Sequence, residues 1–386
     1  MSERPAPEST ALTVNAGSSS LRLASYVLGE TPRCVAEAHY APAPVPDAAV
    51  VTAFLAEQSL PSPAIAMHRV VHGGPRLRGP CAITADVEAE IARLKTLAPL
   101  HNGVALDWIG ASRAALGANV VQAACFDTAF YADLPAVAAQ YALPVDLTDR
   151  HHVRRYGFHG LAHQSMLDRW HNLSHTDGDR RVISLQLGGG CSMTATDHGW
   201  PIETSMGFSP LDGLMMATRC GDLDPAAVLY LVEEGGFEPA ELSWILNESS
   251  GLRAVSGQSA DMKTLLESET DDAALAVAMF CHRVRHYLGA YLVALGGADA
   301  ILFGGGIGER APEIRARVLD HLDWAGIRLD TARNAAISTT DGGRIHSDDS
   351  RVEIWVTPTD EEGVMARAAH ELLTQLAAST TTEDRP

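Results

Sequence analysis

The stretch TVNAGSSSLR, residues 13–22, decides the fold, because a turn of small polar residues separates two apolar runs. Residues 11–14 are apolar before the turn, and LRLASYV (21–27) alternates in polarity after it. Alternation with a period of two is typical of a half-buried strand, and NAGSSS supplies the residues of a tight loop. The sequence here predicts a strand, a loop and a second strand.

The same pattern returns in the second half of the chain. VISLQL (182–187) is apolar and alternating, GGG (188–190) turns, and CSMTATD (191–197) alternates again before a further turn toward WPIETSM (200–206). Both copies place small residues at the loop. We therefore expect an internal duplication, with two halves that begin with the same three strands.

A third glycine-rich loop, GGGIGER (304–310), follows the largely apolar residues 298–303, which end in ILF, and precedes a helical stretch at 311–322. This order is strand, loop, helix, and Pro312 suits the first turn of a helix. Upstream of it, apolar residues recur at intervals of three and four, which indicates a long helix with one buried stripe. The stripe consists of Val277, Cys281, Val284, Leu288, Tyr291 and Leu295.

Length and composition limit the class of protein. The 386 residues suffice for two to three domains, and 46% hydrophobic with 20% charged residues describes an ordinary globular chain. Because 29 basic and 48 acidic residues give a net charge of -19, we expect no nucleic-acid or membrane partner. The six cysteines form no C-x-x-C pair, and we find no secretory leader or membrane-spanning run, so we expect free thiols and a cytoplasmic location.

The glycine-rich loops are candidates for phosphate binding. Backbone N–H groups in NAGSSS, LGGG and FGGGIGE can approach phosphate oxygens closely, since bulky side chains are missing there. Each loop alone is as compatible with a structural turn. No Gly-Lys-Ser/Thr occurs, and GGGIGE lacks the last glycine of G-x-G-x-x-G, so the usual P-loop and dinucleotide fingerprints are absent.

Four polar residues stand where phosphoryl-transfer chemistry would need them. Arg69 and Arg219 lie in turn-rich surroundings, and Asp127 follows an apolar run, at the carboxyl end of an expected strand. His159, in RRYGFHG, follows two arginines. Surface arginines, a capping aspartate and a core histidine are the structural alternatives. A Mg²⁺ held by phosphates, water and one carboxylate such as Glu361 would leave no sequence motif.

Ten strings together resemble the acetokinase (acetate kinase) family of the sugar kinase and actin-like ATPase superfamily. They occur in the family's order between residues 14 and 363, which is nearly the whole chain. The strings are NAGSSSLR, HRVVHGG, APLHN, FDTAF, YALP, RRYGFHG, ETSMGFSPLDGLMMATRCGDLDP, SGLRAVSG, FGGGIGE and TPTDEE.

The resemblance implies an α/β fold of two duplicated βββαβαβα domains, of ribonuclease H-like and actin-like ATPase type, around a central cleft. The implied domains are residues 1–128 with 361–386, and residues 129–360 as the nucleotide-binding domain. The implied reaction is reversible transfer of the γ-phosphoryl group of ATP to acetate, with Mg²⁺ or Mn²⁺, in a homodimer.

The resemblance also implies site residues, carried over position by position. The catalytic residues are Arg69, Asp127, His159 and Arg219. The acetate pocket is formed by Arg69, Val71, Leu100, Phe158 and Pro210, and the metal is held near Asn15 and Glu361. The nucleotide and its phosphates are bound by Ser18, Ser20, Arg22, Gln186, Gly188, Gly189, Gly190, Asp261, Met262, Lys263, Gly305, Gly306, Ile307 and Gly308.

The chain departs from the family pattern in its second phosphate loop. QLGGG stands where the family usually has H-L-G-N-G, so Gln186 replaces histidine and Gly189 replaces asparagine. Glutamine donates a neutral hydrogen bond but carries no positive charge. Arg310 stands where asparagine is usual, and Met262 replaces an aromatic residue. These departures leave two alternatives open: a propionate or pyrophosphate-linked acyl kinase, and a nucleotide-binding pseudoenzyme.

Overall fold

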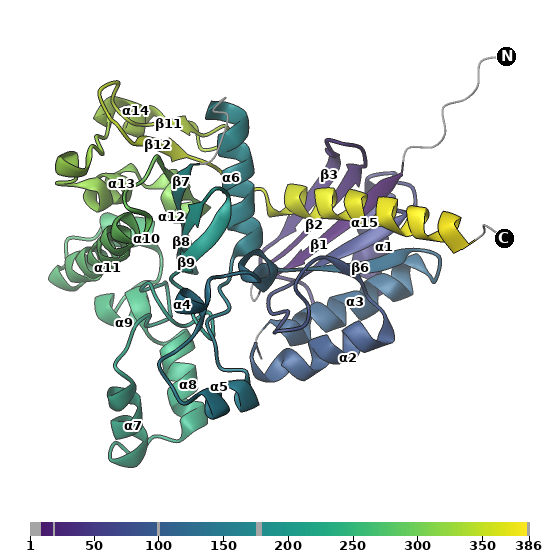
Figure 1. The fold of residues 1–386 in the computed structure, drawn as a ribbon, viewed down its shortest axis with the longest axis horizontal. Helices are drawn as coiled ribbons and strands as arrows, with labels where there is room; N and C mark the ends of the chain where they lie inside the picture. Colours follow the sequence, from purple (N-terminus) through teal and green to yellow (C-terminus); the bar gives the residue numbers. More distant parts are fainter. Residues whose placement is uncertain (1–8, 18–19, 99–100, 175–179, 384–386) are drawn as a thin grey trace. The chain divides into compact units, whose positions relative to one another are not determined.

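The structure, a computed structural model, describes residues 9–17, 20–98, 101–174 and 180–383. The chain divides into two compact units (Figure 1). Unit 1 comprises Met1–Ala132 together with Asp360–Pro386, and unit 2 comprises Asp133–Thr359.

Unit 1 contains a six-stranded mixed sheet in the described residues, with strand order β3-β2-β1-β4-β6-β5. The first three strands pair antiparallel, β1, β4 and β6 run parallel, and β5 pairs antiparallel with β6. Its elements are β1 (Thr10–Ala16), β2 (Leu21–Val27), β3 (Arg33–Tyr40), α1 (Ala48–Glu57), β4 (Ile65–Val70), β5 (Cys81–Ala82), α2 (Ala85–Arg93), η1 (Leu94–Thr96), α3 (Asn102–Leu116), β6 (Val121–Phe126), η2 (Asp127–Tyr131) and α15 (Glu361–Glu383).

Unit 2 contains a second six-stranded sheet in the described residues, with order β11-β12-β10-β7-β8-β9. Its elements are α4 (Ala136–Ala139), α5 (Val145–His151), α6 (Gly160–Ser174), β7 (Arg181–Leu187), β8 (Cys191–Asp197), β9 (Trp200–Thr204), α7 (Pro225–Glu233), α8 (Pro239–Glu248), α9 (Gly251–Ser256), α10 (Met262–Leu266), α11 (Asp271–Leu295), β10 (Ala300–Gly304), α12 (Gly305–Arg310), α13 (Pro312–Leu319), η3 (Asp323–Ala325), α14 (Thr331–Ala336), β11 (Gly343–Arg344) and β12 (Glu353–Val356).

The two sheets confirm the predicted duplication. Read from its other end, the unit 2 sheet repeats the strand order of unit 1, with β7, β10 and β12 parallel and the flanking strands antiparallel. In each sheet the first three strands form a meander, as the two turn motifs predict. The carboxyl ends of the three parallel strands lie at one edge, where α/β sheets place their ligands.

Helices cover both faces of the unit 1 sheet, and they come from opposite ends of the chain. Leu23 on β2 packs with Phe54 of α1 and Trp108 of α3, all nearly inaccessible to solvent. The next residue, Ala24, points to the other face and packs against Ala366 of α15. Figure 1 shows α15 along this face. The C-terminal helix thereby brings Glu361 to the unit that contains β1.

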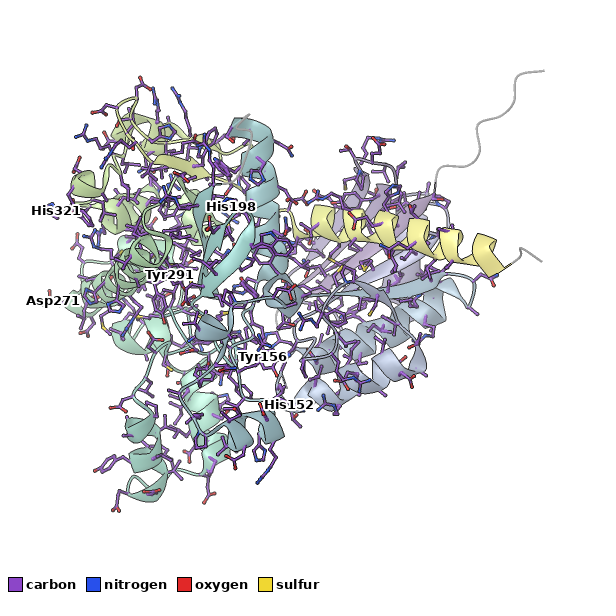
Figure 2. The ribbon with its side chains drawn as sticks, viewed as in Figure 1. His152, Tyr156, His198, Asp271, Tyr291 and His321 are labelled. Carbon is purple, nitrogen blue, oxygen red and sulfur yellow. The ribbon has the colours of Figure 1, made fainter. Side chains whose placement is uncertain are left out.

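The predicted long helix is α11, which runs from Asp271 to Leu295. The Thr270 side chain accepts a hydrogen bond from the Ala273 amide at the start, and Gly296 ends the helix with a φ of 69°. The predicted stripe is buried up to Tyr291, which Figure 2 labels on this helix, whereas Leu295 in the last turn is half-buried.

Two further observations concern the whole chain. All six cysteines are free thiols, as the sequence predicts. Among the described helices, none combines the length and apolar character that crossing a bilayer requires.

Candidate active site

A cluster of charged and amide side chains lies in unit 1 where β1, β4 and β6 end. The Arg69 guanidinium donates from Nε to Asp127 Oδ1 at 3.1 Å and from Nη2 to Asp127 Oδ2 at 2.7 Å. Its Nη1 donates to Asn15 Oδ1 at 3.2 Å and lies 3.3 Å from Glu361 Oε2. The structure therefore brings together the four residues that the sequence predicts in this unit for catalysis and metal binding.

The Asn15 amide joins two neighbouring carboxylates of α15. Asn15 Nδ2 donates to Glu361 Oε2 at 2.7 Å and to Glu362 Oε1 at 2.8 Å. Glu362 Oε2 lies 3.7 Å from Nη1 of Arg22, whose side chain is half exposed. Sequence reasoning missed Glu362, although its place beside Glu361 in TPTDEE was the available signal.

The electrostatics of this cluster follow from burial and close charge. Burial opposes the charge of Arg69, but Asp127 and Glu361 outweigh it and raise the pKa of the guanidinium. Burial, and next the charge of Glu361, raise the pKa of Glu362. Asp127 is 1% exposed, and the two hydrogen bonds from the Arg69 guanidinium pair its buried carboxylate with a cation.

The donors in this cluster fit a hard divalent cation of the Mg²⁺ type. Glu361 supplies carboxylate oxygen, and Asn15 supplies an amide oxygen that Arg69 now occupies. Among the described residues there is no group of three or more His, Cys, Asp or Glu side chains that could enclose a metal ion. Mg²⁺ commonly takes one or two protein oxygens and fills its octahedron with water and phosphate.

Two further predicted residues of unit 1, Ser20 and Val71, are close in sequence to members of this cluster. Ser20 closes the loop between β1 and β2, where its carbonyl oxygen accepts from the Gly17 amide at 2.8 Å. Val71 follows β4 and is buried. The predicted residues Ser18 and Leu100 lie outside the described residues.

A second cluster lies in unit 2, where His159 and Arg219 face the glycine turn between β7 and β8. A Cβ atom built on Gly190 would lie 3.3 Å from His159 Nε2 and 3.7 Å from Arg219 Nη1. Arg219 Nη1 also donates to the carbonyl oxygen of Pro210 at 3.1 Å. Gly190 therefore leaves room where an imidazole nitrogen and a guanidinium meet.

Backbone contacts hold the Arg219 loop against this turn. The Ala217 amide donates to the Gly189 carbonyl oxygen at 3.1 Å, and the Met216 amide donates to the Arg219 carbonyl oxygen at 3.1 Å. Gly251, with a φ of 63°, permits the close approach, since a Cβ there would lie 2.2 Å from the Met216 oxygen. Burial lowers the pKa of Arg219, and Glu248 only partly offsets it.

The segment before His159 is fixed by its own contacts. Tyr156, which is buried, donates its hydroxyl to the His152 carbonyl oxygen at 2.9 Å, and Figure 2 labels both residues. Phe158 is buried, and His159 itself takes a left-handed φ of 58° before α6 begins. Such a backbone is uncommon for a residue with a side chain and indicates a position set by its surroundings.

Unit 2 also contains a cavity of about 490 Å³, a size suited to a small-molecule ligand. Seven of the predicted nucleotide-binding residues line it: Gly188, Gly189, Asp261, Met262, Lys263, Gly306 and Ile307. Gln186, Gly190, Gly305 and Gly308 are not among its lining residues. Leu266 and Pro312 line the cavity without having been predicted, because only the tertiary fold brings α10 and α13 to the glycine loops.

Gln186 lies at the end of β7 against the third glycine loop. A Cβ on Gly305 would lie 2.9 Å from Gln186 Nε2, and Gln186 Oε1 is buried without a hydrogen-bond partner. The glutamine that replaces the family's histidine is thus packed beneath the loop. Its side-chain oxygen is therefore a buried acceptor that receives no hydrogen bond.

These features define a class. Two sheets of one strand order, with glycine turns and charged residues at the ends of their parallel strands, are typical of phosphotransferases with duplicated actin-like ATPase domains.

Comparisons with known proteins narrow this class. A model of the Acetokinase family matches residues 48–367. Acetate kinase from Solibacter usitatus is 46% identical over 308 residues, covering 78% of this chain and 73% of that protein. The crystal structure of acetate kinase from Porphyromonas gingivalis covers 95% of this chain and 100% of its own, at 30% identity and a TM-score of 0.82. A propionate kinase from Francisella tularensis covers 93% and 98%, at 32% identity and a TM-score of 0.83.

The chain belongs to the acetokinase family. It is a kinase of the kind that transfers a phosphoryl group to a carboxylate, and the family uses ATP.

Proposed function

We propose that this protein is an acetate kinase, which transfers the γ-phosphoryl group of ATP reversibly to acetate and yields acetyl phosphate and ADP. The observation that carries the proposal is the cluster of Arg219, His159 and Gly190. A guanidinium, an imidazole nitrogen and a glycine backbone lie together there, and they are the kinds of donor that a transferring phosphoryl group needs.

The reaction is a direct in-line displacement. A carboxylate oxygen of acetate attacks the γ-phosphorus, the bond to the oxygen that bridges to the β-phosphorus breaks, and ADP leaves with that electron pair. Arg69 orients the acetate carboxylate, and Arg219 with His159 stabilises the charge on the equatorial oxygens. Asp127 holds Arg69 in place through its two hydrogen bonds. The chemistry needs no covalent enzyme intermediate.

The proposed metal role follows the fit of the unit 1 donors. Mg²⁺, when bound, neutralises phosphate charge and helps to align donor and acceptor. Asn15 and Glu361 would hold it together with phosphate and water. In this proposal Arg22 and Ser20 stand beside the phosphates.

The cavity of unit 2 supports a nucleotide as donor. Gly306 carries no side chain, and a Cβ there would meet only Arg310 Nη2, at 3.8 Å. Space for a nucleoside is therefore kept between the glycine loops and α10. An enzyme that uses pyrophosphate has no need of such a cavity.

Propionate is a second candidate for the acid substrate. The likeness to a propionate kinase favours activity on propionate as well. Val71 and Phe158, both buried, are the proposed residues near the methyl group, with Pro210 and Leu100. An added methylene changes discrimination by only about 1 to 3 kcal/mol, so we expect acetate to be preferred and propionate to be used.

We further propose a homodimer formed through unit 2. Helix α7 has an apolar sequence, PAAVLYLVE, yet none of its residues is buried. Leu229 and Tyr230 on α7 and Trp244 on α8 are at least 58% exposed, and the two helices contact each other. A second copy of the chain would cover this face. Light scattering should give twice the chain mass, and Leu229→Glu should give the monomer.

We also propose the bounds of the two domains and the location of the protein. The domains 1–128 with 361–386 and 129–360 are supported by the division into two compact units near those positions. A cytoplasmic location is supported by the six free thiols, because a reducing compartment keeps cysteines in that state.

A hydroxylamine trap for acyl phosphate tests the function. Purified protein is incubated with Mg²⁺, acetate or propionate, and either ATP or pyrophosphate. We expect the largest hydroxamate yield from acetate with ATP, a smaller yield from propionate, and background from pyrophosphate. No hydroxamate in any combination, from folded protein that binds nucleotide, would contradict the proposal and favour a pseudoenzyme.

A further inference from the structure

A chain of side-chain hydrogen bonds leads from His159 into the core of unit 2. His159 Nδ1 lies 2.9 Å from Ser192 Oγ, and Ser192 Oγ lies 2.8 Å from His163 Nε2. His163 Nδ1 in turn lies 2.7 Å from Ser184 Oγ. His163 lies four residues after His159, in the first turns of α6, and the two serines come from the neighbouring strands β7 and β8.

Three of the four hydrogen-bonded side chains are inaccessible to solvent. His163 and Ser192 are 0% exposed, and Ser184 is 1% exposed. Burial lowers the pKa of His163 well below its ordinary value, with a smaller contribution from His159. His163 is therefore neutral and has one ring N–H and one acceptor nitrogen.

Two arrangements let the hydrogen bonds run in one direction through all four side chains. The Ser192 hydroxyl has one proton and sits between two ring nitrogens, so it can donate to only one of them. If Ser184 donates to His163 and His163 to Ser192, then Ser192 donates to His159 Nδ1. A neutral His159 then carries its proton on Nε2. In the reverse arrangement, His159 Nδ1 donates inward and a neutral His159 has a bare Nε2.

The surroundings of Nε2 select between the two. This nitrogen faces Gly190 beside Arg219, where the proposed function places the phosphoryl group. Phosphoryl oxygens only accept hydrogen bonds, so Nε2 must carry a proton to bind them. The outward arrangement provides that proton without a positive charge on His159.

We propose that Ser192, His163 and Ser184 are positioning residues that hold the proton of neutral His159 on Nε2, aimed at the transferring phosphoryl group. This inference rests on the proposed function for the identity of that group. It assigns a role to three buried side chains that do not touch substrate.

The tautomer is measured directly by ¹⁵N NMR of protein labelled at histidine. The His159 signals are assigned by their loss in His159→Gln. In the wild-type protein we expect His159 with a protonated Nε2 and an unprotonated Nδ1, and this result needs no activity. A His159 with its proton on Nδ1 would overturn the inference.

Kinetics of Ser192→Ala supply the second readout. Loss of the partner behind a functional histidine costs roughly 10-fold to 100-fold in other sites, so we expect kcat to fall by at least about 10-fold with KM for ATP changed less than about twofold. Ser184→Ala, which spares the bond to His159, should show the same direction with a smaller loss. Ser165→Ala is the matched control, because this buried serine of α6 donates to the Ala162 carbonyl oxygen within the same helix.

The outcomes separate the two claims. An active wild-type enzyme whose Ser192→Ala variant keeps both kcat and the His159 tautomer overturns the positioning role. If the Ser192→Ala variant does not fold, the His159 tautomer in the wild-type protein and the kcat of Ser184→Ala test the positioning role instead. Wild-type protein that forms no acyl phosphate contradicts the proposed function, while the NMR result still tests the proton arrangement.

Discussion

The two clusters of the candidate site differ in how their arginines are held. Arg69 in unit 1 is bound by Asp127 through two bonds and lies 3.3 Å from Glu361. Arg219 in unit 2 has only a carbonyl oxygen and a sulfur atom as hydrogen-bond acceptors, and none of the described carboxylates lies within ion-pair distance of it. Burial accordingly lowers the pKa of Arg219, whereas the carboxylates raise that of Arg69.

The different surroundings of Arg69 and Arg219 indicate the charge of the ligand that each cluster suits. In the unit 1 cluster the acidic side chains outnumber the basic ones, which suits a cation. In unit 2 an unneutralised guanidinium, an imidazole and glycine amides suit an anion. An arginine that lacks an ion pair is costly to bury, so its charge is explained by a ligand that completes the site.

Replacing Arg69 with alanine should give the largest effect, because it acts on stability and activity together. Asp127 would be left buried without its cation, and breaking such a pair costs about 3 to 5 kcal/mol. Urea unfolding checks the stability, and hydroxamate formation checks the activity. The control is Arg113→Ala, which removes an exposed pair with Glu88 and should cost less than about 1 kcal/mol. Equal losses in the two variants would remove the structural role of Arg69.

Replacing Arg219 with alanine should separate activity from stability. We expect kcat to fall by roughly 100-fold to 1000-fold, the usual cost of one donor to a transition-state oxyanion. The free energy of unfolding should change by less than about 1 kcal/mol, since no ion pair is broken. Arg253→Ala removes an exposed positive charge from the same unit and should leave kcat unchanged. An Arg219 variant as unstable as the Arg69 variant would erase the contrast between the clusters.

Replacing Gln186 with histidine should raise activity by a smaller factor. A ring that can be protonated would return positive charge to the end of β7, and we expect kcat to rise by about 10-fold, a fraction of what a full oxyanion donor supplies. Gln186→Met, which has neither charge nor donor, should show no gain. Unchanged turnover in the histidine variant would mean that the departure from H-L-G-N-G is harmless.

Replacing Glu362 with glutamine should have the smallest effect. It should change how the free energy of unfolding depends on pH. Burial, together with Glu361, raises the pKa of Glu362 above its ordinary 4.5 in the folded protein, so the folded state favours the protonated acid. That stabilisation is complete below pH 4.5 and is lost as the pH rises through the folded pKa.

Glu362→Gln keeps a neutral side chain at every pH. We therefore expect its stability to rise relative to wild type as the pH increases above 4.5, by less than about 1 kcal/mol. Urea unfolding across this range, with EDTA present, measures the difference. A difference that stays constant with pH would show that Glu362 does not titrate in this way.

Local pattern predicts the positions of the strands well. The alternation in residues 21–27 predicts a half-buried strand, and the structure has β2 at Leu21–Val27 but with helices over both of its faces. The C-terminal helix is different. The residues VMARAAHELL (364–373) indicate a helix that starts at Val364, yet α15 begins at Glu361, since the Asp360 side chain accepts from the Gly363 amide and caps the first turn.

Contacts between distant residues are what the sequence does not reveal. Ser192 lies 33 residues after His159, and neither pattern nor motif marks them as partners. Periodicity also does not predict the exposed apolar surface of α7. Its sequence PAAVLYLVE is typical of a core helix, whereas in the described part of the chain none of its residues is buried. Such features depend on the tertiary arrangement of each unit.

The central claim is that the carboxylate attacks the γ-phosphorus directly, without a phosphorylated enzyme intermediate. The stereochemical course at phosphorus tests it most directly, using ATP made chiral at the γ-phosphorus with oxygen isotopes. One in-line displacement predicts inversion of configuration in the acetyl phosphate formed. Retention would require two displacements through a phosphorylated side chain, and it would contradict the account.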